Sequence, residues 1–183
     1  MRKIFILFFI SIFISCGDDV LPKPKGYLNL SYPNASYKKL ALERPFSFDV
    51  SKYTVIKDEK NNWIKIQYPT LKASIDITYR PVKNNIRELL IEAEKLVFKH
   101  TVKAEQISSN NFLNKKTKVY GTVHKITGNA ASQIQFHVTD STKHFIKGAL
   151  FFYTKPNYDS ILPAVDYIKK DIAVIMESLE WKE

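Results

Sequence analysis

The sequence has 183 residues, 45% hydrophobic and 13% aromatic, which is typical of one globular domain and excludes a disordered chain. Lys and Arg outnumber Asp and Glu by 28 to 18, for a net charge of +10. These positive residues are scattered and form no arginine-rich run, so nucleic acid is not an expected partner. The only cysteine is Cys16, which excludes a disulfide within the monomer.

The first 15 residues are predicted to be a lipoprotein signal peptide. Basic residues at 2–3 precede an apolar run at 4–14, which is shorter than the roughly 20 residues of a membrane-spanning helix. Ser15 is the small residue that a lipoprotein signal peptidase requires before Cys16. We therefore expect cleavage before Cys16 and attachment of fatty acyl chains such as palmitate, which bind a membrane with about 0.8 kcal/mol per buried methylene. The alternative is an ordinary signal peptide with an incidental cysteine.

The segment after the cleavage site is predicted to be a tether. Pro-Lys-Pro-Lys at 22–25 favours an extended polyproline II conformation that would hold a domain away from the membrane. Two positive charges leave with the signal peptide, so the net charge falls from +10 to +8. The predicted organisation is a signal peptide at 1–15, a lipidated Cys16 with a Pro/Lys tether at 16–26, and a single globular domain at 27–183.

The first half of this domain is predicted to form strands followed by a helix. Alternation of apolar and polar residues predicts strands at 27–32, 53–57, 63–68 and 73–79. Apolar residues three and four positions apart predict an amphipathic helix at 84–100. Residues 101–113 fit either a short helix or a strand and loop.

The second half is predicted to contain three strands and a final helix, with Trp181 packed at its end. The strands are expected at 118–126, 132–139 and 145–153, and the last is a nearly continuous apolar run that indicates a central strand. Turns are expected at 128–129 and 140–142, and the helix at 161–179.

These elements predict the α+β class: a mainly antiparallel β-sheet covered by two long amphipathic helices, each burying its apolar stripe on the sheet. The order of strands, helix, strands and helix is similar to that of the PsbP/Mog1-type α/β/α sandwich.

The sequence contains no strong catalytic or metal-binding motif. His124 and His137 could be cross-strand neighbours with His144 on the next strand, but the lack of further ligands favours sheet-surface or partly buried histidines over a metal site. His137, Asp140 and Ser141 are close in sequence, yet no nucleophile elbow accompanies them and turn hydrogen bonds explain Asp140 and Ser141. We therefore predict no enzyme activity, metal, cofactor or small-molecule substrate.

Several sequence strings point to one known family. They lie at 22–27, 68–69, 72–75, 99–104, 119–121, 128–136 (GNAASQIQF), 139–142 (TDST), 144–145, 148–150, 156–160 and Trp181. Together they resemble the gliding motility lipoprotein GldD family of the Bacteroidota, over nearly the whole chain from about residue 22 to residue 181.

The resemblance implies a cell-envelope lipoprotein that is required for gliding and linked to the type IX secretion machinery, with no known catalytic activity. It implies a non-enzymatic assembly or stability component, anchored on the periplasmic side, at the outer rather than the inner membrane. Its partners would be other envelope proteins of the gliding and secretion apparatus. The family pattern also implies cysteines where this chain has Arg44 and Asn62, so that a family disulfide would be missing here.

Partner contacts are expected where the family-like strings coincide with turns, in an exposed apolar or aromatic patch. The candidate residues are Asn129, Ser132, Asp140, Ser141, His144 and Phe145. Two other functions stay open. One is a module that binds an envelope polymer, peptidoglycan or lipopolysaccharide, through its positive charge and its Tyr and Trp side chains; the other is an enzyme using His137, Asp140 and His144.

Overall fold

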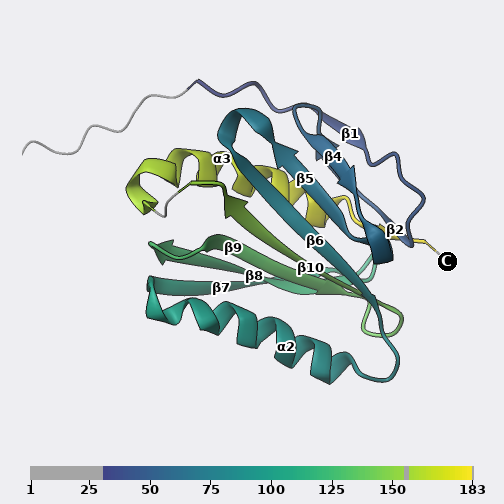
Figure 1. The fold of residues 1–183 in the computed structure, drawn as a ribbon. Helices are drawn as coiled ribbons and strands as arrows, with labels where there is room; N and C mark the ends of the chain where they lie inside the picture. Colours follow the sequence, from purple (N-terminus) through teal and green to yellow (C-terminus); the bar gives the residue numbers. More distant parts are fainter. Residues whose placement is uncertain (1–30, 155–156, 183) are drawn as a thin grey trace, which may run out of the picture.

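A computed structural model describes residues 31–154 and 157–182 (Figure 1). The predicted signal peptide, Cys16 and the tether lie outside the described residues, as do residues 27–30 of the first predicted strand. Ser31 and Tyr32, the remainder of that strand, have no regular secondary structure. Within the described ranges, no helix combines the length and the apolar character needed to cross a membrane.

The centre of the fold is a seven-stranded antiparallel sheet in the order β4-β5-β6-β10-β9-β8-β7. Its strands are β4 (Val55–Asp58), β5 (Ile64–Tyr68), β6 (Ala73–Pro81), β7 (Ala104–Asn114), β8 (Val119–Gly128), β9 (Ser132–Thr139) and β10 (His144–Phe152). The central position of β10 confirms the interpretation of its apolar run. β7, in the segment that the sequence left ambiguous, is a full edge strand paired with β8.

Short elements complete the fold. β1 (Tyr37–Lys39) pairs with β3 (Asp49–Ser51), and β2 (Phe46–Ser47) pairs with β11 (Glu180–Trp181). Single 3₁₀ turns are η2 (Lys60–Asn62), η3 (Pro69–Leu71) and η4 (Lys99–Val102). At the two positions of the implied family disulfide, Arg44 forms an ion pair with Asp58, and Asn62 ends η2 with a left-handed φ of 62°.

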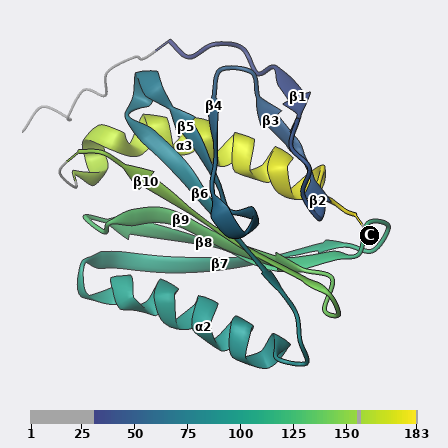
Figure 2. The ribbon, with the colours of Figure 1, turned by 45° about the vertical axis from the view of Figure 1, so that its right-hand side comes forward.

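Two helices lie on opposite sides of the sheet: α2 (Ile86–Phe98) below it and α3 (Tyr158–Glu177) above it in Figures 1 and 2. The prediction of a sheet covered by two long helices, together with the likeness to an α/β/α sandwich, is wrong: strand residues outnumber helical ones among the described residues, and the two helices leave part of the sheet uncovered. α2 has only 13 residues, against 20 in α3, and most of β7 is exposed. The α-helix ends at Phe98, two residues before the predicted end at 100. The chain continues as the 3₁₀ turn η4, and the segment after it pairs as β7.

The main hydrophobic core lies between the sheet and α3. The largest of its fully buried side chains come from the sheet, from α3 and from the β2–β3 segment: Phe46, Phe48, Phe136, Ile64, Ile66, Ile75, Ile77, Ile134, Ile146, Leu150 and Ile168. The alternation predicted for β5 and β6 places their apolar residues on this face. Gly148 lies directly under the ring of Phe136, where a β-carbon would collide with it.

The face toward α2 is polar by comparison. α2 buries Leu89, Ala93 and Val97 in two small clusters, one around Phe145 and one around Ile126. Strand alternation places other residues beside Phe145 on this face. They include Ser74, Asp76, His124, Gln135, His137 and Lys147.

Candidate functional site

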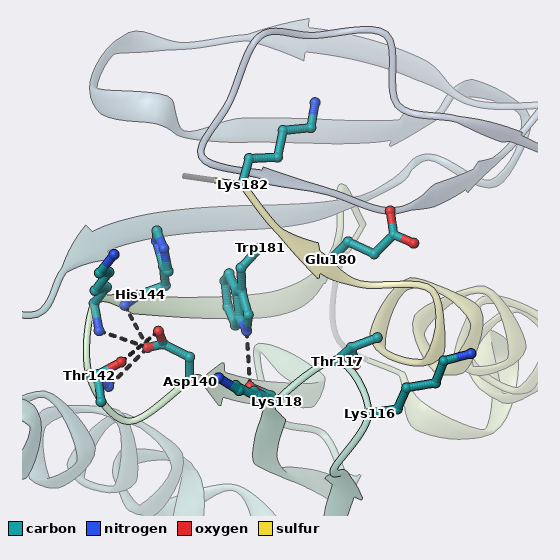
Figure 3. Close-up of a pocket in the computed structure, with 10 residues that line it drawn as sticks. Lys116, Thr117, Lys118, Asp140, Thr142, His144, Glu180, Trp181 and Lys182 are labelled. Carbon is teal, nitrogen blue, oxygen red and sulfur yellow. Dashed lines mark hydrogen bonds between the residues drawn. The ribbon is translucent and has the colours of Figure 1, made fainter.

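A pocket of about 390 Å³ opens at the end of the sheet where β9 turns into β10 (Figure 3). It is formed by the β7–β8 loop, the β9–β10 turn, the start of β10 and the C-terminal strand β11. The lining residues that matter most here are Asp140, His144 and Trp181. Two of the predicted partner-binding residues therefore line a concave surface.

Asp140 organises the turn before β10. Its Oδ1 accepts hydrogen bonds from the backbone N–H groups of Thr142 (3.0 Å), Lys143 (2.8 Å) and His144 (2.8 Å), and its Oδ2 accepts from the Thr142 hydroxyl (2.8 Å). Burial alone would raise the pKa of Asp140, but these hydrogen bonds outweigh it and lower the pKa below its usual value. Ser141 takes a left-handed φ of 70° in the same turn. The interpretation of this segment as a turn is confirmed.

His144 and Trp181 form the aromatic wall of the pocket. Their rings are stacked, with centroids 5.1 Å apart and an interplanar angle of 7°. The Tyr79 hydroxyl is hydrogen-bonded to His144 Nδ1 at 2.9 Å, and Trp181 Nε1 donates to the Lys118 carbonyl at 3.0 Å. Burial lowers the pKa of His144, so the wall is neutral and aromatic at pH 7.

Lysines surround this wall. Lys116, Lys118, Lys143 and Lys182 line the pocket, while the Glu180 carboxylate is paired with Lys39 at 2.8 Å. The carboxylate of Asp140 is already bonded to its own turn. The pocket therefore offers positive charge beside aromatic surface, a combination that suits an anionic group.

The six predicted partner-binding residues do not form one patch. Asn129 and Ser132 lie at the opposite end of β9 from Asp140, Ser141 and His144. There, exposed Asn129 accepts a hydrogen bond from the N–H of Tyr158 at 2.9 Å, and buried Ser132 donates to the Ile134 carbonyl at 3.1 Å. Phe145 is buried against α2.

Three of the eight exposed large apolar side chains among the described residues lie along α2 and η4. Ile91 is 44% exposed, Phe98 55% and Val102 85%. Leu90, Ile91 and Phe98 line a shallow groove of about 540 Å³ on α2. The sequence contained a signal for this exposed surface, because Ile91 and Phe98 are apolar but do not belong to the set of apolar residues predicted to face the sheet.

The residues of the enzyme hypothesis are divided between the two faces. The His137 ring stacks on Phe145 on the α2 face, with centroids 5.9 Å apart, whereas His144 contacts Tyr79 and Trp181 on the other face. Asp140 and Ser141 are close to His144 and not assembled with His137. The geometry therefore does not bring His137 together with Asp140 and Ser141. It also does not bring His137 together with Asp140 and His144, the residues of the enzyme hypothesis.

The sequence interpretation of His124 and His137 as cross-strand neighbours is confirmed. They lie on β8 and β9 with ring centroids 6.1 Å apart, and Glu94 of α2 approaches both. Glu94 was missed because its position depends on how the helix docks on the sheet.

The comparisons with known proteins give one match. A family described as gliding motility lipoprotein GldD matches residues 17–181. No curated protein matches the chain. Because the match covers almost all of the sequence, the chain belongs to the GldD family of gliding motility lipoproteins, which are lipid-anchored proteins of the cell envelope.

Proposed function

We propose that this gliding-related lipoprotein is a non-enzymatic assembly or stability component of the gliding and type IX secretion apparatus. The observation that carries the proposal is the family match over residues 17–181. We further propose that Cys16, directly before the matched region, carries the lipid and holds the domain on the periplasmic side of the outer membrane.

The surface of α2 supports a protein as the partner. Ile91, Phe98 and Val102 expose apolar area that the isolated domain does not use in its core. Such area is typical of the buried centre of a protein interface. We propose that a partner protein covers this part of α2 with apolar side chains.

The β9–β10 end supplies a second contact in this proposal. The lysines around His144 and Trp181 suit an acidic segment of the partner. Exposed Ser141 and Asn129 are proposed as direct contacts at the two ends of β9, while Asp140, Ser132 and Phe145 hold the neighbouring backbone in place from within.

A deletion strain complemented with variants tests the assembly role. Ile91→Glu combined with Phe98→Glu is expected to abolish colony spreading and to reduce secretion, while the protein remains at normal abundance on immunoblots. Arg87→Glu, an exposed charge reversal on the same helix, is the matched control and is expected to spread normally. Normal spreading and secretion in the deletion strain itself would refute the proposal.

The anchor is tested separately. Cys16→Ala is expected to abolish metabolic labelling with fatty acids and to release the protein from the outer-membrane fraction. A variant that remains in the same fraction, or a wild-type protein that takes up no label, would contradict the role of Cys16.

A second candidate function, binding of an anionic envelope polymer, is favoured by the lysine-lined pocket alone. Sedimentation with peptidoglycan and with lipopolysaccharide at two salt concentrations distinguishes it, because binding through lysines weakens as salt rises. Lys118→Ala with Lys143→Ala is expected to lose binding, whereas Lys169→Ala with Lys170→Ala on exposed α3 positions is the control. Equal binding by both double variants would exclude this site.

A further inference from the structure

Three side chains of metal-ligand type converge between α2 and the sheet. Glu94 comes from α2, His124 from β8 and His137 from β9. One ligand atom from each lies within 4.8 Å of the others. The two histidines are 2% and 4% exposed, while the Glu94 side chain is 40% exposed and forms the open side of the cluster.

His124 has a buried nitrogen without a partner. Its Nδ1 is hydrogen-bonded to the Ser109 hydroxyl at 2.8 Å, but its Nε2 has no hydrogen-bond partner among the described residues. Glu94 Oε1 is 3.3 Å from this Nε2, yet the two groups are not aligned as a hydrogen bond. A buried polar atom without a hydrogen-bond partner is unfavourable, so the arrangement favours a ligand that uses Nε2.

We propose that Glu94, His124 and His137 bind a transition-metal ion of the zinc type between α2 and the sheet. Imidazole nitrogens with one carboxylate oxygen are a donor set that zinc accepts, and two ligand atoms of a tetrahedral zinc are about 3.3 Å apart. The separation of His124 Nε2 from Glu94 Oε1 already equals that spacing. A ligand atom of His137 lies within 4.8 Å of the other two, so a movement of this side chain toward them would complete the set.

The surroundings suit metal binding. The Ser109 hydroxyl on Nδ1 orients the His124 ring and leaves Nε2 pointing toward the other ligands, as outer-shell hydrogen bonds do in metal sites. The stacked ring of Phe145 fixes the plane of His137.

Such an ion would tie α2 to the sheet. α2 buries only three side chains, so one bond from Glu94 to an ion held by β8 and β9 would add to a weak attachment. Three protein ligands also leave a fourth position on the exposed Glu94 side, for water or for a donor from a partner.

Titration of the intact protein with Zn²⁺ tests the proposal. Full-length protein without a histidine tag, in detergent and stripped with chelator, is titrated with ZnCl₂ and, as a hard-cation control, with MgCl₂. We expect one Zn²⁺ per chain and no Mg²⁺ binding. Glu94→Gln is expected to weaken Zn²⁺ binding at least about tenfold, while Glu88→Gln on the same helix and His100→Ala bind as the wild type does.

A variant of His137 and a hydrogen-exchange measurement provide two further tests of the metal site. His137→Phe keeps an aromatic ring on Phe145 and removes the ligand nitrogen, so it is also expected to lose Zn²⁺. If His137→Phe does not fold by circular dichroism, Glu94→Gln decides, since Glu94 is partly exposed. Zn²⁺ should also slow hydrogen exchange of the α2 amides. Absence of Zn²⁺ binding, or equal binding by Glu94→Gln and Glu88→Gln, would overturn the proposal.

Discussion

The two faces of the seven-stranded sheet differ in chemistry. The face toward α3 carries one continuous apolar core that also includes Phe46 and Phe48. The face toward α2 has two small apolar clusters separated by polar groups such as His124, His137 and Lys147. The α3 face therefore supplies most of the hydrophobic free energy, whereas the α2 face keeps several polar and ionisable side chains between its small apolar clusters.

The same substitution on each face measures this difference. Leu150 on the α3 face and Leu89 under α2 are 0% and 2% exposed. Leu150→Ala is expected to lower the free energy of unfolding by about 4–5 kcal/mol, and Leu89→Ala by about 2–3 kcal/mol, because the small cluster around Leu89 can collapse into the space. Urea denaturation followed by circular dichroism gives both values. Equal losses would mean that the two faces contribute alike.

The close packing on the α3 face can be tested at Gly148. A β-carbon there would collide with the Phe136 ring across β9 and β10, so Gly148→Ala is expected to lower the free energy of unfolding by about 2–3 kcal/mol. Phe136→Leu should relieve the collision, making the double variant less destabilised than the sum of the single ones. Strict additivity in that double-mutant cycle would show that the ring is not what opposes the methyl group.

The pocket end should respond to pH through Asp140. Asp140→Ala is expected to cost about 1–2 kcal/mol at pH 7, because three N–H groups lose their acceptor. Since the folded pKa is below the usual 3.8, the carboxylate contributes stability above that value and loses it as pH falls through the lowered pKa. The gap between wild type and variant should therefore narrow in acid, as urea midpoints at several pH values would show. Asp140→Asn, which keeps an oxygen acceptor, should lose less.

The buried carboxyl of Asp171 is an exception to the apolar character of the α3 face. It accepts hydrogen bonds from the hydroxyls of Tyr37 and Tyr68, each at 2.9 Å. Burial raises its pKa although these bonds oppose the shift, and burial beside this carboxyl raises the pKa of Tyr37 to about 12. The raised pKa means that the contribution of Asp171 to stability falls as pH rises above 3.8.

Tyr68→Phe removes one of these donors and is expected to cost about 1 kcal/mol at pH 7. The cost should be smaller in acid, because protonation removes the negative charge that the Tyr68 hydroxyl stabilises. Thermal unfolding at pH 7 and pH 4 measures the change, with Tyr158→Phe as a control remote from Asp171. A cost that grows in acid would show that the Tyr68 hydroxyl does not stabilise the ionised carboxylate of Asp171.

Local patterns predicted the strands well. β9 occupies the predicted range, and β5, β6 and β10 agree within two residues, because alternation is a property of the strand itself. The pairs β1–β3 and β2–β11 were not predicted, since two or three residues carry no periodicity and their pairing joins distant segments. The prediction that two long helices cover the sheet was wrong for a related reason. The apolar stripe of a helix shows that the helix packs on a sheet, but not how much of the sheet it covers.

In the candidate site, too, contacts between residues close in the sequence were predictable and contacts between distant residues were not. The Asp140 turn was predictable because its acceptor and donors lie within four residues. The wall formed by His144 and Trp181, 37 positions apart in the sequence, depends on the pairing of β11 with β2. Glu94 joins the two histidines only through the docking of α2. Residues that meet through tertiary contacts leave no local pattern.

The β11–β2 pairing has a consequence for biogenesis. Trp181 pairs with Phe46, and the N–H of Lys182 donates to the Pro45 carbonyl at 2.9 Å, so residues that leave the ribosome late are fastened to a segment that leaves it early. The lysine-lined pocket consequently forms only after translation and export have delivered the C-terminal strand. A chain that ends before β11 would therefore lack this surface, because Trp181 forms one wall of the pocket.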